Sequence, residues 1–176
     1  MIIGKRIFLR EVEEADLDSI VKWRNDPEIL RKLFSYLPLC KVKQRKWYEK
    51  YLDDDTQQIF IIEVKEQKTP IGTIGLTNID YKNQRAELAI MIGEKDHWGR
   101  GLGEEALNLL VKFAFNEMNL RKIKALVFSD NDKAIKLYEE CGFKEERILR
   151  EEIFKKGKFR DVVVMSLFRR NTHEKE

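Results

Sequence analysis

The stretch from His97 to Ala106 reads HWGRGLGEEA, with glycine at three alternate positions. An apolar run, from Glu87 to Ile92, precedes this stretch, and apolar residues at helical spacing follow it as far as Phe115. The sequence therefore predicts a strand, a glycine-rich turn and a helix in that order. This order is typical of an α/β fold, in which such a turn lies at the end of a sheet strand.

The predicted turn has the chemistry of an anion site. The first amides of a helix lack internal hydrogen-bond partners, and the helix dipole is positive at that end. Glycine lets the backbone approach a ligand with no Cβ in the way and adopts positive φ at little steric cost. Arg100, between two of the glycines, adds a positive charge where a phosphate would lie. The turn therefore predicts a diphosphate ligand.

The composition indicates one globular domain. A chain of 176 residues can bury most of its unfolded surface around a single core. Its 43% hydrophobic and 37% charged residues argue against disorder. The net charge of +3 is small and the signs are interleaved, so we expect no nucleic-acid partner. No linker, repeat or low-complexity tract divides the chain, so we expect one domain over residues 1–176.

Cysteine and histidine usage bears on the compartment and on metal binding. Cys40 and Cys141 lie far apart in the sequence, which is typical of free thiols in a reducing compartment. The N-terminus lacks the long apolar core of a signal peptide, and no apolar run approaches the ~20 residues that cross a bilayer. We therefore expect a cytoplasmic protein with no membrane partner. Two histidines and two separated cysteines offer no metal-ligand spacing, so we expect no metal.

Periodicity and turn residues predict the other elements along the chain. The predicted helices cover residues 13–24, 28–34, 43–52 and 102–118, and one that Asn131 or Asp132 caps and Gly142 ends. The predicted strands cover residues 3–10, 59–64, 71–79, 85–92 and 122–128, and a long hairpin follows over 143–168. This order predicts an α/β fold with a mixed central sheet flanked by helices.

Three stretches carry a resemblance to a known family. They are Leu9-Arg10 with WRNDP at 23–27, RAELAI at 85–90 running into WGRGLG at 98–103, and NDKAIKLYEECGF at 131–143. A GxGxG pattern alone is weak evidence, but followed by NxxAxxLYxxxGF at this spacing it is specific. The chain resembles the GCN5-related N-acetyltransferase (GNAT) superfamily, nearest to the branch of ribosomal-protein N-terminal, spermidine and nucleotide-linked amino-sugar acetyltransferases.

The resemblance implies how acetyl-CoA, the co-substrate, would bind. In this fold strands 85–92 and 122–128 run parallel and splay apart, and the pantetheine arm lies in the wedge between them. A backbone N–H near Met91 or Ile92 would hold the developing oxyanion. Asn131 is left with two roles, helix cap and co-substrate contact. The residues implied to contact the co-substrate are Ile90, Met91, Ile92, Gly99, Arg100, Gly101, Leu102, Gly103, Glu104 and Asn131.

Two residues are candidates for proton transfer. The resemblance implies that Tyr138 protonates the departing thiolate; the alternative is an aromatic on a buried helical stripe. Glu87, an acidic residue in an apolar strand, is the candidate base that takes a proton from the attacking amine. Its alternatives are an ion pair with a cation such as Arg85, and deprotonation of the amine through a chain of waters. His97 is left between a cofactor contact and a solvated loop position.

The resemblance places the acceptor pocket between the first helices and the C-terminal hairpin. It implies a primary-amine acceptor: a polyamine, a nucleotide-linked amino sugar, an aminoglycoside or a protein N-terminus. A polyamine pocket should present several carboxylates, and Glu28, Glu87 and Asp53 to Asp55 are available. The candidate pocket residues are Trp23, Arg24, Asn25, Phe34 and Tyr36 on one side, and Phe154, Phe159 and Arg160 on the other.

Two further hypotheses concern catalysis and assembly. The alternative to an enzyme is a non-catalytic acyl-CoA-binding regulatory module on the same fold. Tyr138 and Glu87 beside an intact glycine turn favour the enzyme. A homodimer is expected from the hairpin, where Phe154 and Val162 to Val164 would offer an apolar surface.

Overall fold

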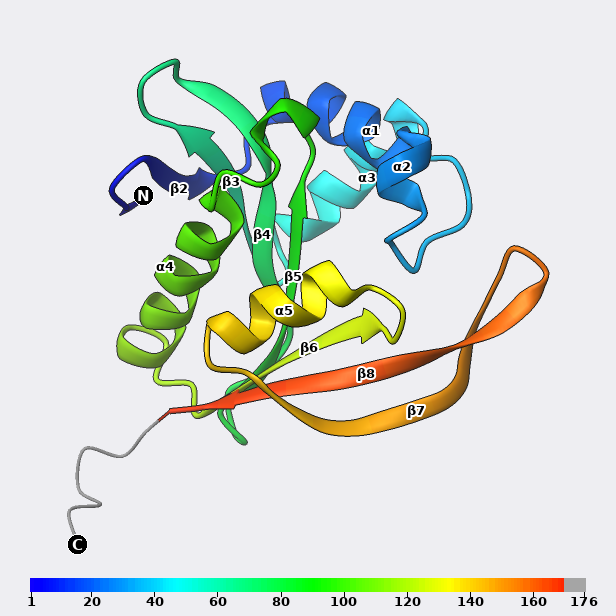
Figure 1. The fold of residues 1–176 in the computed structure, drawn as a ribbon. Helices are drawn as coiled ribbons and strands as arrows, with labels where there is room; N and C mark the ends of the chain where they lie inside the picture. The colour runs from blue at the N-terminus through cyan, green and yellow to red at the C-terminus, as the bar shows by residue number, and fades with distance from the viewer. Residues whose placement is uncertain (170–176) are drawn as a thin grey trace, which may run out of the picture.

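The computed structural model describes residues 1–169 of the chain (Figure 1). These residues form one eight-stranded sheet in the order β1-β2-β3-β4-β5-β6-β8-β7, and β5 and β6 are its parallel pair. The strands are β1 (Ile2–Ile3), β2 (Ile7–Glu11), β3 (Gln58–Val64), β4 (Thr69–Asp80), β5 (Arg85–Ile92), β6 (Lys122–Phe128), β7 (Lys144–Lys155) and β8 (Lys158–Phe168). The helices are α1 (Leu17–Asn25), α2 (Pro27–Leu30), α3 (Lys41–Tyr51), α4 (Leu102–Asn116) and α5 (Asp132–Glu140). The predicted mixed α/β fold is confirmed.

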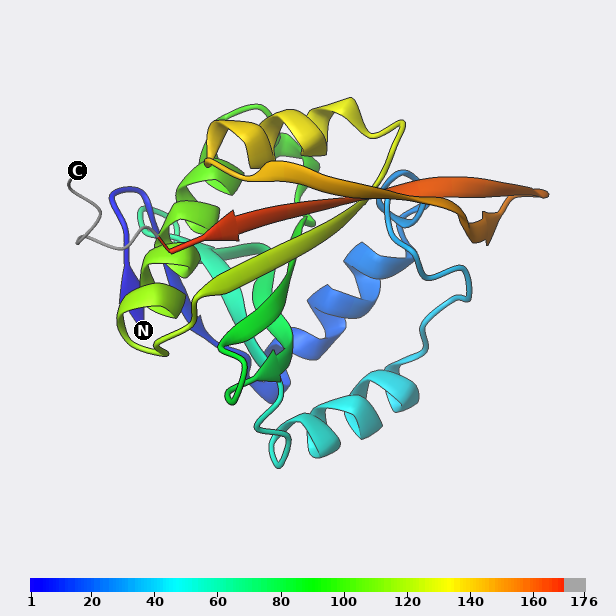
Figure 2. The ribbon, with the colours of Figure 1, turned by 90° about the horizontal axis from the view of Figure 1, so that it is seen from below.

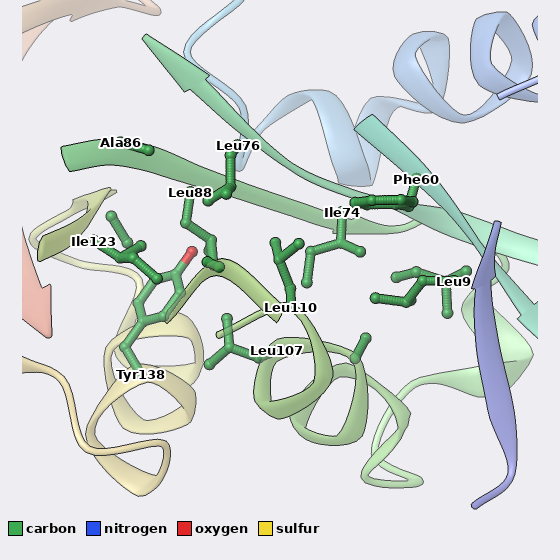
Figure 3. Close-up of a cluster of buried hydrophobic side chains, with 14 of the residues drawn as sticks. Leu9, Phe60, Ile74, Leu76, Ala86, Leu88, Leu107, Leu110, Ile123 and Tyr138 are labelled. Atoms are coloured by element: carbon green, nitrogen blue, oxygen red, sulfur yellow. The ribbon is translucent and has the colours of Figure 1, made fainter. Parts of the chain in front are cut away.

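Helices cover both faces of the sheet (Figures 1 and 2). On one face α4 and α5 enclose the larger core, to which Leu107 and Leu110 contribute fully buried side chains (Figure 3). Each such leucine stabilises the fold by roughly 1.5–3 kcal/mol. On the other face α1 packs a second core around Trp23 and Ile61. The sheet thus separates the two cores, and a ligand between β5 and β6 could contact residues on both faces.

The parallel pair β5–β6 comes apart partway along its length. Pairing covers Arg85 to Leu88 on β5 and Lys122 to Ala125 on β6. Beyond it, β5 stays paired with β4 as far as Ile92, while β6 stays paired with β8 as far as Phe128. Because each strand follows a different neighbour, the sheet opens between them. The predicted splay is confirmed.

The structure corrects several local predictions. The strand expected over 3–10 is two strands, because Gly4 N–H bonds to the Ile7 carbonyl and turns the chain between them. The helix expected over 28–34 ends at Leu30. Val162 to Val164 are at most 4% exposed, with Val163 in the larger core, and therefore offer no apolar surface for a dimer. Phe154 is 58% exposed, as expected.

No helix within residues 1–169 has both the length and the apolar character needed to cross a membrane. The expected single domain over residues 1–176 includes residues 170–176, which lie outside the described part of the chain.

Candidate active site

The glycine turn connects β5 to α4 and leaves the start of that helix without a side-chain cap. Gly99 and Gly101 have φ of +71° and +72°, a left-handed conformation that favours glycine. Gly101 is the N-cap of α4, and because glycine has no side chain it supplies no side-chain acceptor for the amides of the first turn. Those amides are therefore available to an anion, as the sequence indicated.

Gly103 has a different reason to be glycine. A Cβ built there would lie 3.8 Å from Ile92 Cγ1 and Leu137 Cδ2, which is ordinary van der Waals contact. Neither backbone conformation nor crowding by the protein therefore requires glycine at this position. A ligand that passes closely over the first turn of α4 would require it, because a Cβ would project toward that ligand. The position thus fits the diphosphate expected from the sequence.

We expect Gly103→Ala to raise the KM for acetyl-CoA about tenfold without loss of stability. Alanine suits a helix interior better than glycine by about 0.5–1 kcal/mol, and the protein itself leaves room for the methyl group. Gly101→Ala is the matched control: its left-handed φ should cost about 1–2 kcal/mol of stability. Thermal unfolding and initial rates measure both effects. An unchanged KM in a stable Gly103→Ala protein would contradict a close ligand at this position.

Arg6 holds the glycine turn in place, a role that sequence reasoning missed. Its guanidinium donates to the Arg100 carbonyl at 2.7 Å and to the Gly101 carbonyl at 3.1 Å. It also donates to the Glu105 carboxylate at 2.8 Å. Burial opposes ionisation of Glu105, but hydrogen bonds from Arg6 and from the Ile7 N–H outweigh it and lower the pKa of that carboxyl. The partners are 99 positions apart, so no sequence spacing signals them.

The edge of β5 that faces the splay carries unpaired backbone groups. Gly93 N–H donates to the Ile71 carbonyl on β4, while the Gln84 carbonyl accepts from Lys122 on β6. Because these groups alternate in direction along a strand, those of even-numbered residues face β6. Trp98 Nε1 donates to the Ile92 carbonyl at 2.9 Å. Among the described residues, Ile90 N–H and C=O and Ile92 N–H are left open.

Met91 is therefore corrected as a source of backbone contacts. As an odd-numbered residue, it directs its N–H and C=O toward β4, where Thr73 is its partner. Of the two residues expected to supply an N–H for the oxyanion, Ile92 alone directs its N–H toward the splay, and the oxyanion role stays a prediction.

Tyr138 lies on α5 between Leu88 and Ile123, with its hydroxyl directed toward β5 (Figure 3). The side chain is 5% exposed and packs against Phe143, and burial raises the pKa of its hydroxyl to about 12. The hydroxyl forms no hydrogen bond with any residue in 1–169. It is nevertheless not among the fully buried polar atoms that lack a partner, since His97 Nδ1 is the one such side-chain atom in these residues. The tyrosine oxygen is therefore not fully enclosed by the protein.

Glu87 lies on the face of β5 opposite Leu88. Its carboxylate accepts from Lys124 Nζ at 3.1 Å and from Asn78 Nδ2 at 3.0 Å, and it is 29% exposed. The ion pair considered for it thus exists, although with Lys124 rather than Arg85. The role of Glu87 as base stays a prediction.

Trp23 is corrected from a substrate contact to a structural support, and Asn25 also supports the chain near α2. Trp23 is 1% exposed, donates from Nε1 to Glu94 at 2.7 Å and packs its ring against the backbone of Gly93. The side-chain amide of Asn25 accepts from the Leu39 N–H at 2.8 Å and donates to the Leu39 carbonyl at 2.7 Å. Trp23 has no other polar atom for an acceptor, whereas Asn25 is exposed and keeps a second amide N–H, so its substrate contact stays a prediction.

The other expected pocket residues stay predictions. Arg24 is half-buried, burial lowers the pKa of its guanidinium, and no carboxylate within residues 1–169 pairs with it. Phe34 packs edge-on against Phe128, with ring centroids 4.9 Å apart. Tyr36 is 71% exposed. Asn131 caps α5 by accepting from the Ala134 N–H at 3.4 Å, which leaves its contact with a co-substrate untested.

A cavity of about 560 Å³ opens between α2, the start of α5 and the turn between β7 and β8. Seven lysine and arginine side chains line it against three carboxylates. Of the carboxylates expected for a polyamine, Glu28 alone lines it; Glu87 binds Lys124, and Asp54 binds Thr56 and Gln57. The structure therefore does not bring the expected acidic set together here.

His97 ends the short helical segment before the glycine turn. His97 is half-buried with Nδ1 enclosed, which corrects the expectation of a solvated loop histidine. No group of three or more histidine, cysteine or acidic side chains in residues 1–169 could hold a metal ion.

Comparisons with known proteins agree with this geometry. Residues 6–144 match the family model described as an acetyltransferase (GNAT) domain. The chain is 34% identical over 170 residues to the uncharacterized N-acetyltransferase p20 of Bacillus licheniformis, covering 94% of each. It is 34% identical over 160 residues to the spermidine N(1)-acetyltransferase of Vibrio cholerae, covering 91% of each. The crystal structure of the Vibrio cholerae spermidine N-acetyltransferase with CoA and spermine matches at a TM-score of 0.88 and 34% identity, over 93% of this chain and 95% of that one.

Proposed function

Because the chain belongs to the GNAT acetyltransferase family and is an acyl-CoA-dependent N-acetyltransferase, we propose that acetyl-CoA binds between β5 and β6 and that a primary amine reaches it from the cavity beside α2. The end of β5–β6 pairing after Leu88 carries this proposal. Beyond Leu88, β5 keeps unpaired backbone donors and an acceptor, and the opening between β5 and β6 there connects the two faces of the sheet.

The co-substrate lies along β5 like an added strand. Ile90 offers an N–H and a carbonyl to the amides of the pantetheine arm, and Ile92 offers an N–H. The diphosphate lies on the first-turn amides of α4, next to Arg100 and over Gly103. Unpaired helix amides and a positive dipole end favour this anion. Trp98 supports the arrangement, because it bonds the Ile92 carbonyl and directs that strand end.

The transfer step is a direct attack without an acyl-enzyme. The neutral amine nitrogen attacks the thioester carbonyl carbon, the C–N bond forms, and the C–S bond breaks with its electron pair leaving on sulfur. Tyr138 donates its proton to that sulfur, which makes CoA a better leaving group. A proton leaves the amine for Glu87, directly or through water. Acid and base thus approach from opposite faces of the sheet.

Release of CoA thiol tests this function. The rate is measured with acetyl-CoA and a panel of amines: spermidine, amino sugars, an aminoglycoside and N-terminal peptides. The expected result is amine-dependent thiol release with formation of the N-acetyl product. Acetyl-CoA binding without any amine-dependent release would instead support the regulatory acyl-CoA-binding module.

We expect Glu87→Gln to lower kcat/KM by at least about tenfold below neutral pH, where amine deprotonation limits the rate. Glutamine keeps the size of the side chain and a bond to Asn78 but accepts no proton. Lys124→Gln is the control, because it breaks the same ion pair and leaves the carboxylate; a pair this exposed is worth about 0–1 kcal/mol. Equal losses of activity in the two variants would show that Glu87 acts through the ion pair and not as a base.

A further inference from the structure

The cavity beside α2 has the size of a small-molecule site. Its volume of about 560 Å³ falls in the usual range for ligand pockets. Three separate segments form it: α2, the chain from Phe128 to Lys133, and the hairpin turn from Lys155 to Arg160. The chain from Phe128 to Lys133 follows the end of β6 that no longer pairs with β5, so this part of the cavity lining begins at the splayed end of that strand.

The carboxylates of this cavity are mostly engaged. Asp130 forms an ion pair with Arg160, and Glu28 lies 3.6 Å from Lys95. Asp132 is in the first turn of α5, where the helix dipole favours a negative charge. Little negative charge is therefore available to a bound cation.

Some of the cations have structural duties. Lys155 donates its three N–H groups to the carbonyls of Leu30, Leu33 and Ser35, and so holds the chain after α2. Lys32 lies 3.9 Å from the centroid of the Trp98 ring. Within the described residues, no carboxylate pairs with the remaining four, which are Arg31, Lys133, Lys156 and Lys158.

The cations that line the cavity repel one another, as the environment of Lys32 indicates. Burial lowers the pKa of Lys32, the charge of Glu28 opposes that change, and the charges of Lys133 and Arg31 add to it. An anionic group bound among them would relieve this repulsion, whereas a polyamine would add further positive charges to it.

Resting on the proposed function, we propose that the acceptor amine carries a phosphate group, which Arg31 of α2 and Lys158 of the hairpin bind while the amine reaches the splay. Charge-assisted hydrogen bonds from these side chains hold the phosphate. The same charges exclude polyamines, the acceptors named for the relatives from Vibrio cholerae. The acceptor specificity of this chain then differs from theirs on an equivalent fold.

The first test measures binding, so that it does not depend on turnover. The protein is saturated with CoA, which fills the co-substrate's own phosphate sites, and is titrated in a calorimeter with glucosamine 6-phosphate, glucosamine, inorganic pyrophosphate and spermidine. We expect the two phosphorylated probes to bind at least about tenfold more tightly than glucosamine or spermidine. Equal or tighter binding of spermidine, or no binding of either phosphorylated probe, would overturn the proposal.

The second test assigns the site. Arg31→Gln/Lys158→Gln removes two exposed charges without touching a buried contact, and Lys43→Gln/Lys46→Gln on α3 removes the same charge elsewhere. We expect the first variant alone to lose the preference for phosphorylated probes, with the KM for acetyl-CoA unchanged. A raised KM for acetyl-CoA, absent with 3′-dephospho-acetyl-CoA, would assign these cations to the co-substrate and overturn the proposal.

A carboxylate probe, glucosaminic acid, distinguishes a requirement for phosphate from a requirement for any anion. Tighter binding of glucosaminic acid than of glucosamine 6-phosphate would overturn the choice of phosphate.

Turnover separates this proposal from the proposed function. If phosphorylated probes bind as expected but no amine releases CoA, the anion site stands and the transferase function fails.

Discussion

Tyr138→Phe is expected to lower kcat by at least about 100-fold while the KM for acetyl-CoA stays within about twofold. Phenylalanine fills the same space between Leu88 and Ile123, so packing is preserved. The lost hydroxyl leaves no partner unsatisfied, because it makes no hydrogen bond within residues 1–169. Initial rates at saturating amine, with thermal unfolding as the stability control, measure the effect. An unchanged kcat would remove Tyr138 from proton transfer and leave it a core residue.

The same variant should change the pH dependence of stability. Burial raises the pKa of Tyr138 to about 12, from an ordinary value of 10.0. The native state therefore favours the neutral phenol, a contribution present below pH 10 that is lost as the pH rises toward 12. We expect wild-type stability to fall across this window more steeply than that of Tyr138→Phe. Since the phenol stays protonated at neutral pH, it can act as an acid there.

Trp23→Ala is expected to lower the free energy of unfolding by about 3–5 kcal/mol. The ring is 1% exposed, packs with Ile20 and Ile61 in the second core, and lies against the backbone of Gly93. Its removal opens a cavity under α1 at the end of β5. Urea denaturation measures the change.

Trp23→Phe is the matched control. Phenylalanine keeps most of the apolar contact but removes the N–H that donates to Glu94, while Lys22 still donates to that carboxylate. We therefore expect the free energy of unfolding to fall by about 1–3 kcal/mol. If Trp23→Ala instead kept its stability and changed only the KM of the amine, the packing role would be wrong and a substrate contact would be supported.

Patterns within short segments predicted what local chemistry controls. The bounds of β5 and β6 agree with the sequence prediction, since apolar runs between turn residues define strands. Asn131 caps α5, and Gly142 has a φ of +88° just after its end. Such features depend on a few neighbouring residues, which the sequence displays directly.

Contacts between distant segments could not be predicted. The pairing of Arg6 with Glu105 spans 99 positions, and no spacing rule connects them. Trp23 resembled a substrate contact because its motif is shared with related enzymes, yet its burial depends on how α1 meets Gly93. Glu87 forms its ion pair with Lys124 rather than with Arg85, because the parallel register places Lys124 beside it on β6.

By itself, the sequence determined the local elements on which the proposed donor site rests. The glycine turn, the strand before it and the helix from Asn131 are continuous segments, and each carries its own conformational and hydrogen-bonding requirements. Only the tertiary structure assembled the cationic cavity that we propose for the acceptor. A net charge of +3 with interleaved signs hides any local excess, which arises when α2 and the hairpin, about 125 positions apart, meet in one cavity. Electrostatic energy depends on distance in space, and the order of residues along the chain does not give that distance.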